Sequence, residues 1–213
     1  MITTTISDDV RQLIEDAVAW RMFGLAFERP RSGWRDHMAS IANDSHDESV
    51  RTVAQLANEQ ASEELFLDIF GPGGAVSPRE VAYRGYADPG HLLSELEAIY
   101  SAFAYEPKTE ECPDHVSVEA GFVGYLRMKQ AFARIVGDAE AEKIAADAVD
   151  MFVGAHLAPV AVGLCKRFED DDSLYVARAA RLMRERLGEV DARVEGEPAE
   201  DDGEMSCGGG CPT

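Results

Sequence analysis

Apolar residues recur at intervals of three and four along most of this chain, and that spacing is typical of amphipathic helices. Behind the capping sequence Ser7-Asp8-Asp9, one broad face carries Val10, Leu13, Ile14, Ala17 and Trp20. No segment shows the sustained alternation of apolar and polar residues that marks a half-buried strand. The pattern therefore predicts an all-α, single-domain helical bundle of roughly seven to nine helices.

Proline and glycine divide the pattern into segments. Gly71-Pro-Gly-Gly ends one helix, and a long loop then runs to about Gly90. A loop of that length inside a domain is usually functional or disordered, and its two tyrosines argue against simple disorder. We expect helices in residues 34–42, 50–57, up to 70, 91–105, 113–136, 138–168 with a kink at Pro159, and 173–187.

The charge of the chain is strongly negative. Its 213 residues include 40 acids and 20 bases, which gives a net charge of -20. This field repels phosphate backbones and attracts a basic peptide, so a nucleic-acid partner is excluded. Residues 189–213 are acidic and poor in apolar side chains, so we expect a flexible tail after a helical domain of residues 1–188.

The sequence also indicates a compartment. The N-terminus has no basic region followed by an apolar stretch, and no window approaches about 18 consecutive apolar residues. Four cysteines, two of them close to the C-terminus, do not make a disulfide framework. We therefore expect a cytoplasmic protein that does not insert into a membrane.

Three short motifs follow one another in the middle of the chain. The first is an aromatic helix end that runs into a rigid turn, formed by Phe66, Ile69, Phe70, Gly71, Pro72 and Gly73. The second is a loop from Pro78 to Tyr83. The third is Glu111-Cys112-Pro113-Asp114-His115, in which Pro113 is expected to open a helix and to place the Asp-His pair in its first turn.

The Asp-His pair has two interpretations. Asp114 and His115 could hold a peptide or transfer protons, or Asp114 could simply cap the helix beside a partly exposed His115. A hydrolase built on this pair would lack a recognisable nucleophile, and the familiar phosphate-loop, dinucleotide and zinc-protease motifs are absent from the sequence. We therefore expect neither catalysis nor a cofactor.

The C-terminal sequence Cys207-Gly-Gly-Gly-Cys211 leaves a second alternative open. The two thiols could bind a metal, with Cys112 and His115 completing a tetrahedral zinc set. Ligands in a glycine-rich tail would pay a large ordering entropy, which disfavours this helical metal-binding protein.

Taken together and in order, the three motifs resemble the TorD/DmsD/NarJ family of cytoplasmic chaperones for molybdenum-containing oxidoreductases. The matching stretches are Phe66-x-x-Ile69-Phe70 with Gly71-Pro72-Gly73, the loop at Pro78, and the run from Glu111 to Val123. The sequence departs from the family pattern at Ile69, Ala120 and Val123, and its loop lacks a tryptophan found in some relatives.

This resemblance implies a function and a site. Such proteins bind the twin-arginine signal peptide or N-terminal segment of a molybdoenzyme catalytic subunit, hold it until the cofactor is inserted, and are not enzymes. The chain would act as a monomer or homodimer. A groove between the 71–90 loop and the 113–136 helix would contact the peptide through Tyr83, Tyr86, Asp114, His115, Glu119 and Phe122.

Overall fold

Helices make up nearly all of the regular structure. The computed structural model describes residues 6–85, 88–169, 171 and 173–187. Within them, the nine α-helices and the absence of strands confirm the all-α prediction. The helices are α1 (Asp8–Ala26), α2 (Trp34–Asp44), α3 (Glu48–Gln60), α4 (Glu63–Phe70), α5 (Pro89–Ala102), α6 (Val116–Val136), α7 (Ala139–Phe152), α8 (Ala158–Arg167) and α9 (Tyr175–Leu187), with a 3-10 turn η1 (Glu80–Tyr83) and a π-helical turn η2 (Val153–Leu157).

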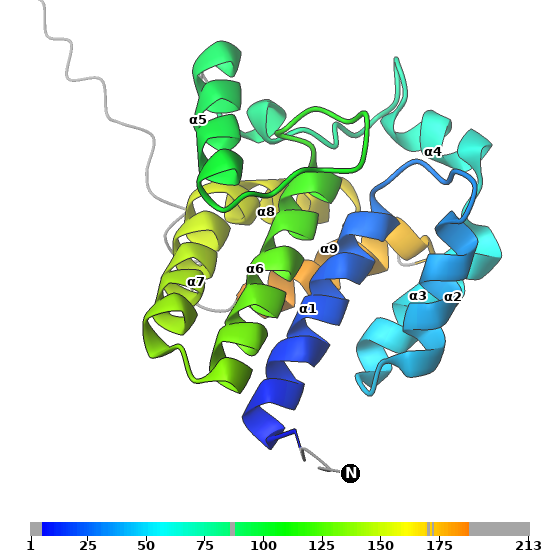
Figure 1. The fold of residues 1–213 in the computed structure, drawn as a ribbon. Coiled ribbons are helices and arrows are strands. Elements are labelled where there is room, and N and C mark those ends of the chain that lie inside the picture. Colours follow the sequence, from blue (N-terminus) through cyan, green and yellow to red (C-terminus); the bar gives the residue numbers. More distant parts are fainter. Residues whose placement is uncertain (1–5, 86–87, 170, 172, 188–213) are drawn as a thin grey trace, which may run out of the picture.

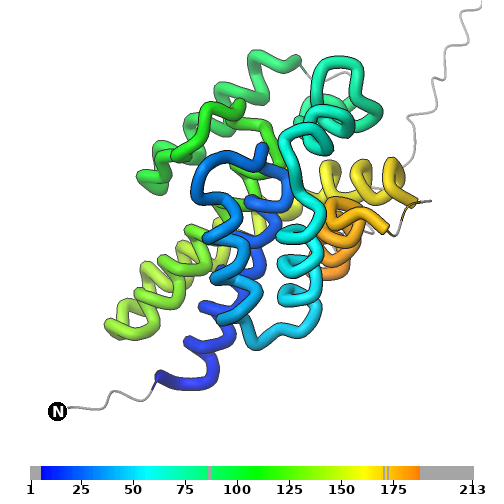
Figure 2. Tube along the Cα trace, turned by 90° about the vertical axis from the view of Figure 1, so that its right-hand side faces the viewer, coloured from blue at the N-terminus to red at the C-terminus, as the bar shows by residue number. Residues whose placement is uncertain are grey.

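The helix α6 lies at the centre of the arrangement. It packs between α1 and α7 (Figure 1), and α2 and α3 form a hairpin beside α1. The helix α9 contacts α1, α3 and α8 from behind, and the side view shows it next to α3 (Figure 2). One continuous core of buried apolar side chains joins these helices. The α5 helix, η1 and α4 lie above this core, at the end where α6 begins (Figure 1).

Glycine allows α1 and α6 to approach closely. A Cβ atom built on Gly124 would lie 3.2 Å from the Ala17 carbonyl oxygen and 3.4 Å from Trp20 Cβ. At the other end of the contact, a Cβ on Gly24 would lie 3.1 Å from the Ser117 carbonyl oxygen. These spacings leave no room for a larger side chain, so the two backbones determine how the central pair of helices packs.

Most predicted helices are confirmed, but the start of α6 is wrong by three residues. Pro113 does not open the helix, because Pro113 and Asp114 form a turn closed by the His115 N–H, which donates to the Cys112 carbonyl at 3.0 Å, and His115 occupies the N-cap. The cause is a tertiary contact: the Val116 N–H donates to the Pro78 carbonyl at 2.8 Å, and the Glu80 N–H donates to the Asp114 carbonyl at 2.8 Å.

The long helix expected in residues 138–168 exists and changes geometry near Pro159, as predicted. Its middle turn, Val153–Leu157, is π-helical rather than α-helical. Proline at the start of α8 cannot donate a hydrogen bond, and the wider turn accommodates this loss. The predicted tail of residues 189–213, including Cys207 and Cys211, lies outside the described residues, as does Tyr86.

The same helical run is the one candidate for a membrane span among the described residues. Ala139–Arg167 is 29 residues long and apolar enough by composition, but 67% of its most apolar window is buried inside the protein. Its burial against α6, α9 and η1 is that of a core helix.

The close packing of α1 on α6 yields a prediction. Replacing Gly124 by leucine should lower the free energy of unfolding by about 1–3 kcal/mol, because the new side chain must push α1 away. Chemical denaturation would measure the loss. The matched control is Gly90→Leu, at an exposed position near the start of α5 where an added Cβ meets only the Asp88 side chain. Equal stability of the two variants would contradict the proposed helix contact.

Candidate functional site

The three sequence motifs, which are up to 50 residues apart in the chain, meet around one open hollow. The hollow has a volume of about 340 Å³. Its lining residues are Phe66, Phe70, Gly71, Pro72, Ser77, Pro78, Arg79, Glu111, Cys112 and His115. We call it the motif hollow.

The aromatic end of α4 and the glycine turn form the first wall. The Phe66 and Phe70 rings pack with their centroids 5.3 Å apart, and Phe70 also contacts Phe27 and Phe168. The turn folds back tightly, so that a Cβ on Gly74 would lie 2.4 Å from the Ile69 carbonyl oxygen. Gly73 has a φ of +86°, which favours glycine. The Gly-Pro-Gly-Gly sequence is thus needed to hold the aromatic wall in place.

The second wall is the segment 77–84, which the start of α6 holds in place. The Asp114 carboxylate is completely buried and accepts a hydrogen bond from Arg79 Nε at 2.8 Å. It also accepts a longer one from the Val81 N–H at 3.4 Å. Asp114 therefore neither caps α6 nor faces solvent: it positions Arg79, whose side chain is 36% exposed at the edge of the hollow.

His115, also at the hollow, is the residue that caps α6. Its Nδ1 accepts a hydrogen bond from the Ser117 N–H at 3.2 Å and lies 2.7 Å from the Ser117 hydroxyl. Burial lowers the pKa of His115 to about 4, although the nearby Asp114 charge opposes this shift. The imidazole is therefore neutral at pH 7, and Nε2 carries its proton because Nδ1 is the acceptor.

Behind the segment 77–84 lies a buried polar cluster. The Glu80 side chain, which has no exposed surface, accepts hydrogen bonds from Arg84, including one from Nε at 2.6 Å. His156, from the π-helical turn, places Nδ1 3.2 Å from both Glu80 oxygens. Arg84 also donates to the Ala155 carbonyl oxygen of that turn. The cluster thereby fastens η1 to the helix pair α7–α8.

Glu119, one turn into α6, completes this cluster. Its carboxyl group is fully buried and no N–H or hydroxyl donor reaches it within the described residues. Burial and the adjacent Glu80 carboxylate raise the pKa of Glu119 well above its usual value. A protonated Glu119 can donate a hydrogen bond to Glu80, so the protonated form is the one that this environment stabilises.

The remaining predicted site residues lie away from the hollow. Phe122 is the centre of an aromatic cluster, with its ring 4.9 Å from Tyr100 and 4.8 Å from Phe152. Tyr83 packs against Gly163 of α8 and donates from its hydroxyl to the Ser77 carbonyl at 2.5 Å. Burial raises the pKa of the Tyr83 hydroxyl to about 12. Of the five predicted contact residues that the structure describes, only His115 lines the motif hollow.

These contacts limit the chemistry of the Asp-His pair. Asp114 is bonded to Arg79 and His115 to Ser117, so the two side chains are not hydrogen-bonded to each other as an acid–base pair would be. Among the described residues, no group of three or more His, Cys, Asp or Glu is arranged to hold a metal ion. The proposal that Cys112 and His115 join Cys207 and Cys211 concerns residues partly outside the described part of the chain.

Sequence reasoning missed Glu80, Arg84 and His156. Glu80 and Arg84 are four residues apart, a spacing that usually marks a solvent-exposed pair. His156 is isolated in sequence and becomes part of the cluster only through the π-helical turn. The one available signal concerned Glu80, which lies within the motif loop from Pro78 to Tyr83.

The neutral His115 cap makes stability sensitive to acid. Its pKa is about 4 in the folded protein and about 6.5 in the unfolded chain, so the unfolded state binds more protons between these values. Stability should fall as the pH drops from about 6.5 to 4. In His115→Asn, an amide oxygen replaces Nδ1 as the cap acceptor and cannot titrate, so this part of the loss should disappear. Denaturation curves from pH 4 to 7 would test this, and identical pH profiles would contradict it.

Glu119 should produce the opposite pH dependence. Its raised pKa means that the folded state holds a proton that the unfolded state has released above about pH 4.5. Between about pH 4.5 and its folded pKa, wild type should therefore lose about 1.4 kcal/mol of unfolding free energy for each unit that the pH rises, relative to Glu119→Gln, which cannot ionise. Urea denaturation of both proteins at several pH values measures the difference. Glu95→Gln, at an exposed site on α5, is the control and should track wild type.

Comparison with known proteins supports the resemblance that the motifs suggested. None of the curated proteins matches the chain. The family model described as nitrate reductase delta subunit matches residues 28–166, a range that includes all three motifs and the buried cluster. Since this match spans well over half of the sequence, the chain belongs to the nitrate reductase delta subunit family, the NarJ/TorD-type chaperones that act in molybdoenzyme maturation.

Proposed function

We propose that this protein is a cytoplasmic chaperone that binds the twin-arginine signal peptide or N-terminal segment of a molybdenum-containing oxidoreductase subunit. It would hold that segment until the cofactor has been inserted, and would catalyse no reaction itself. The main support is the convergence of three separate motifs around one hollow in a chain of this family.

The chemistry of the motif hollow suits such a segment. Phe66, Phe70 and Pro72 offer apolar and aromatic surface for an apolar stretch or a guanidinium face. Glu111, at the edge of the hollow, has a side chain that is 24% exposed and can accept a hydrogen bond from arginine. The net charge of -20 would draw a basic segment toward the protein.

The buried carboxylates have a different place in this proposal. Asp114 and Glu119 have no exposed surface, so a direct contact with a guanidinium requires the segment 77–84 to move. In the arrangement described here they position the wall of the hollow instead. Their direct contact with a peptide, and that of Tyr83, Tyr86 and Phe122, stays a prediction.

Calorimetry with the first 30 or so residues of the client subunit would test the proposal. Phe70→Ser should weaken binding about tenfold or more, because it removes an aromatic wall. Glu111→Lys should weaken it by a similar factor and reduce its salt dependence, because it reverses the charge at the edge. A peptide whose two arginines are replaced by glutamine should bind less tightly to wild type.

Two controls make the result specific. Glu95→Lys changes the net charge as Glu111→Lys does, but at an exposed site on α5 outside the hollow, and should bind nearly as wild type does. Phe70 contributes to the core, so its variant must first show a wild-type circular dichroism spectrum. If Glu111→Lys and a folded Phe70→Ser both bind the peptide as tightly as wild type, the motif hollow is not the site.

A further inference from the structure

A second surface, on α6 and α7, exposes an unusual amount of apolar area. In the described part of the chain, large hydrophobic side chains with high exposure are concentrated here. Phe132 is 66% exposed. The other members of this surface are Met128, Ile135, Val136, Ile144 and Met151. Their spacing along each helix places them in stripes, and a contiguous stripe of this kind marks an interaction surface.

Two hollows join to form a groove along α6. The first, of about 640 Å³, lies between α1, α6 and residues 104–108, and the second, of about 630 Å³, lies between the end of α5, α6 and α7. Tyr125 and Met128 border both. From Gly121 to Val136 the groove follows roughly 22 Å of helix, which is about four turns. We call it the α6 groove, and it shares no lining residue with the motif hollow.

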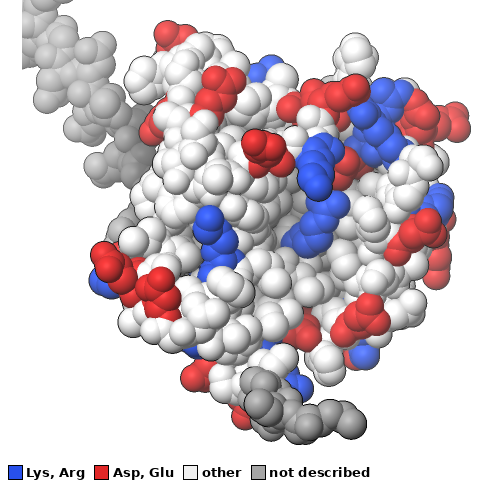
Figure 3. Space-filling view, viewed as in Figure 1, with Lys and Arg blue, Asp and Glu red and all other residues white. Residues whose placement is uncertain are grey.

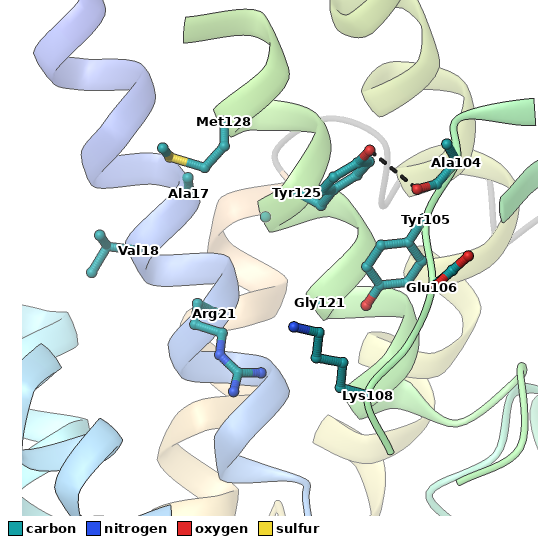
Figure 4. A pocket seen from close by; sticks show the side chains of 11 residues that line it. Ala17, Val18, Arg21, Ala104, Tyr105, Glu106, Lys108, Gly121, Tyr125 and Met128 are labelled. Atoms are coloured by element: carbon teal, nitrogen blue, oxygen red, sulfur yellow. Dashed lines mark hydrogen bonds between the residues drawn. The ribbon is translucent and has the colours of Figure 1, made fainter. Parts of the chain in front are cut away.

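Cationic side chains enter the first hollow from opposite sides. Arg21 reaches in from α1 and Lys108 from the 104–108 segment (Figure 4). Both are exposed, and neither makes a hydrogen bond or ion pair with a described residue. Burial raises the pKa values of Glu28 and Tyr105, and the positive charge of Arg21 acts against this shift at both residues. A carboxylate from outside would fit between the two cations and meet both charges.

The charges that line the α6 groove differ in sign from the chain as a whole. Lys129 adds a third cation, with Nζ 5.1 Å from the Tyr125 ring centroid. The lining acids are Glu106 and Asp138, and the Asp138 carboxylate is engaged in capping α7, where it accepts from the Ala141 N–H at 3.0 Å. Figure 3 shows Lys and Arg side chains beside a broad uncharged area over α6. In a chain with twice as many acids as bases, this positive groove selects for an acidic partner.

We propose that the α6 groove docks an amphipathic helix of a partner protein. The apolar stripe of that helix would lie along Met128, Phe132 and Val136, and a carboxylate on its flank would reach Arg21 and Lys108. A groove of about four turns with apolar walls suits a helix. A twin-arginine segment would be repelled by the same cations, so this surface goes beyond the proposed function and takes a ligand of opposite charge.

A pair of designed peptides tests the charge preference. The probe is a fluorescent 18-residue helix with leucine at positions i, i+3, i+4 and i+7 and glutamate on both flanks, and its partner carries lysine in place of glutamate. Fluorescence anisotropy with the full chain should show about tenfold tighter binding of the acidic probe, weakening with salt. Nonspecific attraction to a chain of net charge -20 would give the opposite order.

Exposed variants assign the effect to the groove. Phe132→Ser should weaken the acidic probe about tenfold, and Lys108→Glu should weaken it while strengthening the lysine probe. Lys143→Glu makes the same charge change at a site on α7 that is 74% exposed and outside the groove, and should have little effect. Binding of the client peptide to the motif hollow should be unchanged in Phe132→Ser, so failure of either proposal can be recognised separately.

Three results would overturn the proposal. The first is equal or tighter binding of the lysine probe, and the second is an affinity for the acidic probe that Phe132→Ser and Lys108→Glu leave unchanged. The third is a wild-type dimer that Phe132→Ser dissociates in sedimentation experiments, which would assign the surface to a second copy of the chain.

Discussion

A completely buried carboxylate, that of Glu80, is the constraint on which the site depends. A buried negative charge that no water reaches needs hydrogen-bond donors from the protein. Removing one partner of such a charge costs about 3–5 kcal/mol of stability. Those donors are Arg84 just after η1, His156 in the π-helical turn and a protonated Glu119 in α6. Because these elements are far apart in the sequence, satisfying this one group fixes the segment 77–84 against the core. The wall of the motif hollow, and the exposed position of Arg79, follow from that placement.

The π-helical turn follows from the same requirement. The core run from α7 to α8 contains Pro159, whose missing N–H already disturbs the hydrogen-bond pattern before it. A wider turn absorbs this disturbance and also directs the His156 imidazole at Glu80, where its ring packs 4.8 Å from Phe152. The same π-helical turn therefore accommodates the missing N–H of Pro159 and supplies a partner for the buried Glu80 carboxylate. This explains why a histidine that is isolated in the sequence is almost fully buried in the fold.

The sequence was sufficient for the helices and insufficient for the contacts between them. Periodicity predicted the helices because the burial of one apolar face determines where they form. The start of α6 was missed because backbone hydrogen bonds with Pro78 and Glu80 hold residues 113–115 in a turn ahead of the helix. Asp114 and His115 were identified as important, but their partners Arg79 and Ser117 depend on tertiary placement and local geometry. In the sequence, the apolar side chains of α6 and α7 have the spacing expected of core residues. Only the packing reveals that Phe132 and its neighbours are left exposed by the described helices.

The two surfaces share no lining residue, but one short segment of the chain contributes to both. The α6 groove is lined by α6, the motif hollow includes the α6 N-cap residue His115, and both are lined by residues of the connection between α5 and α6. Residues 104–108 border the α6 groove, and Glu111 and Cys112 border the motif hollow a few residues later. The Tyr100 hydroxyl anchors this connection by donating to the Pro113 carbonyl at 2.8 Å. Lys108 of the α6 groove and Glu111 of the motif hollow therefore lie on the same short stretch of backbone. This connection, rather than the helix core, is the part of the chain that the two surfaces have in common.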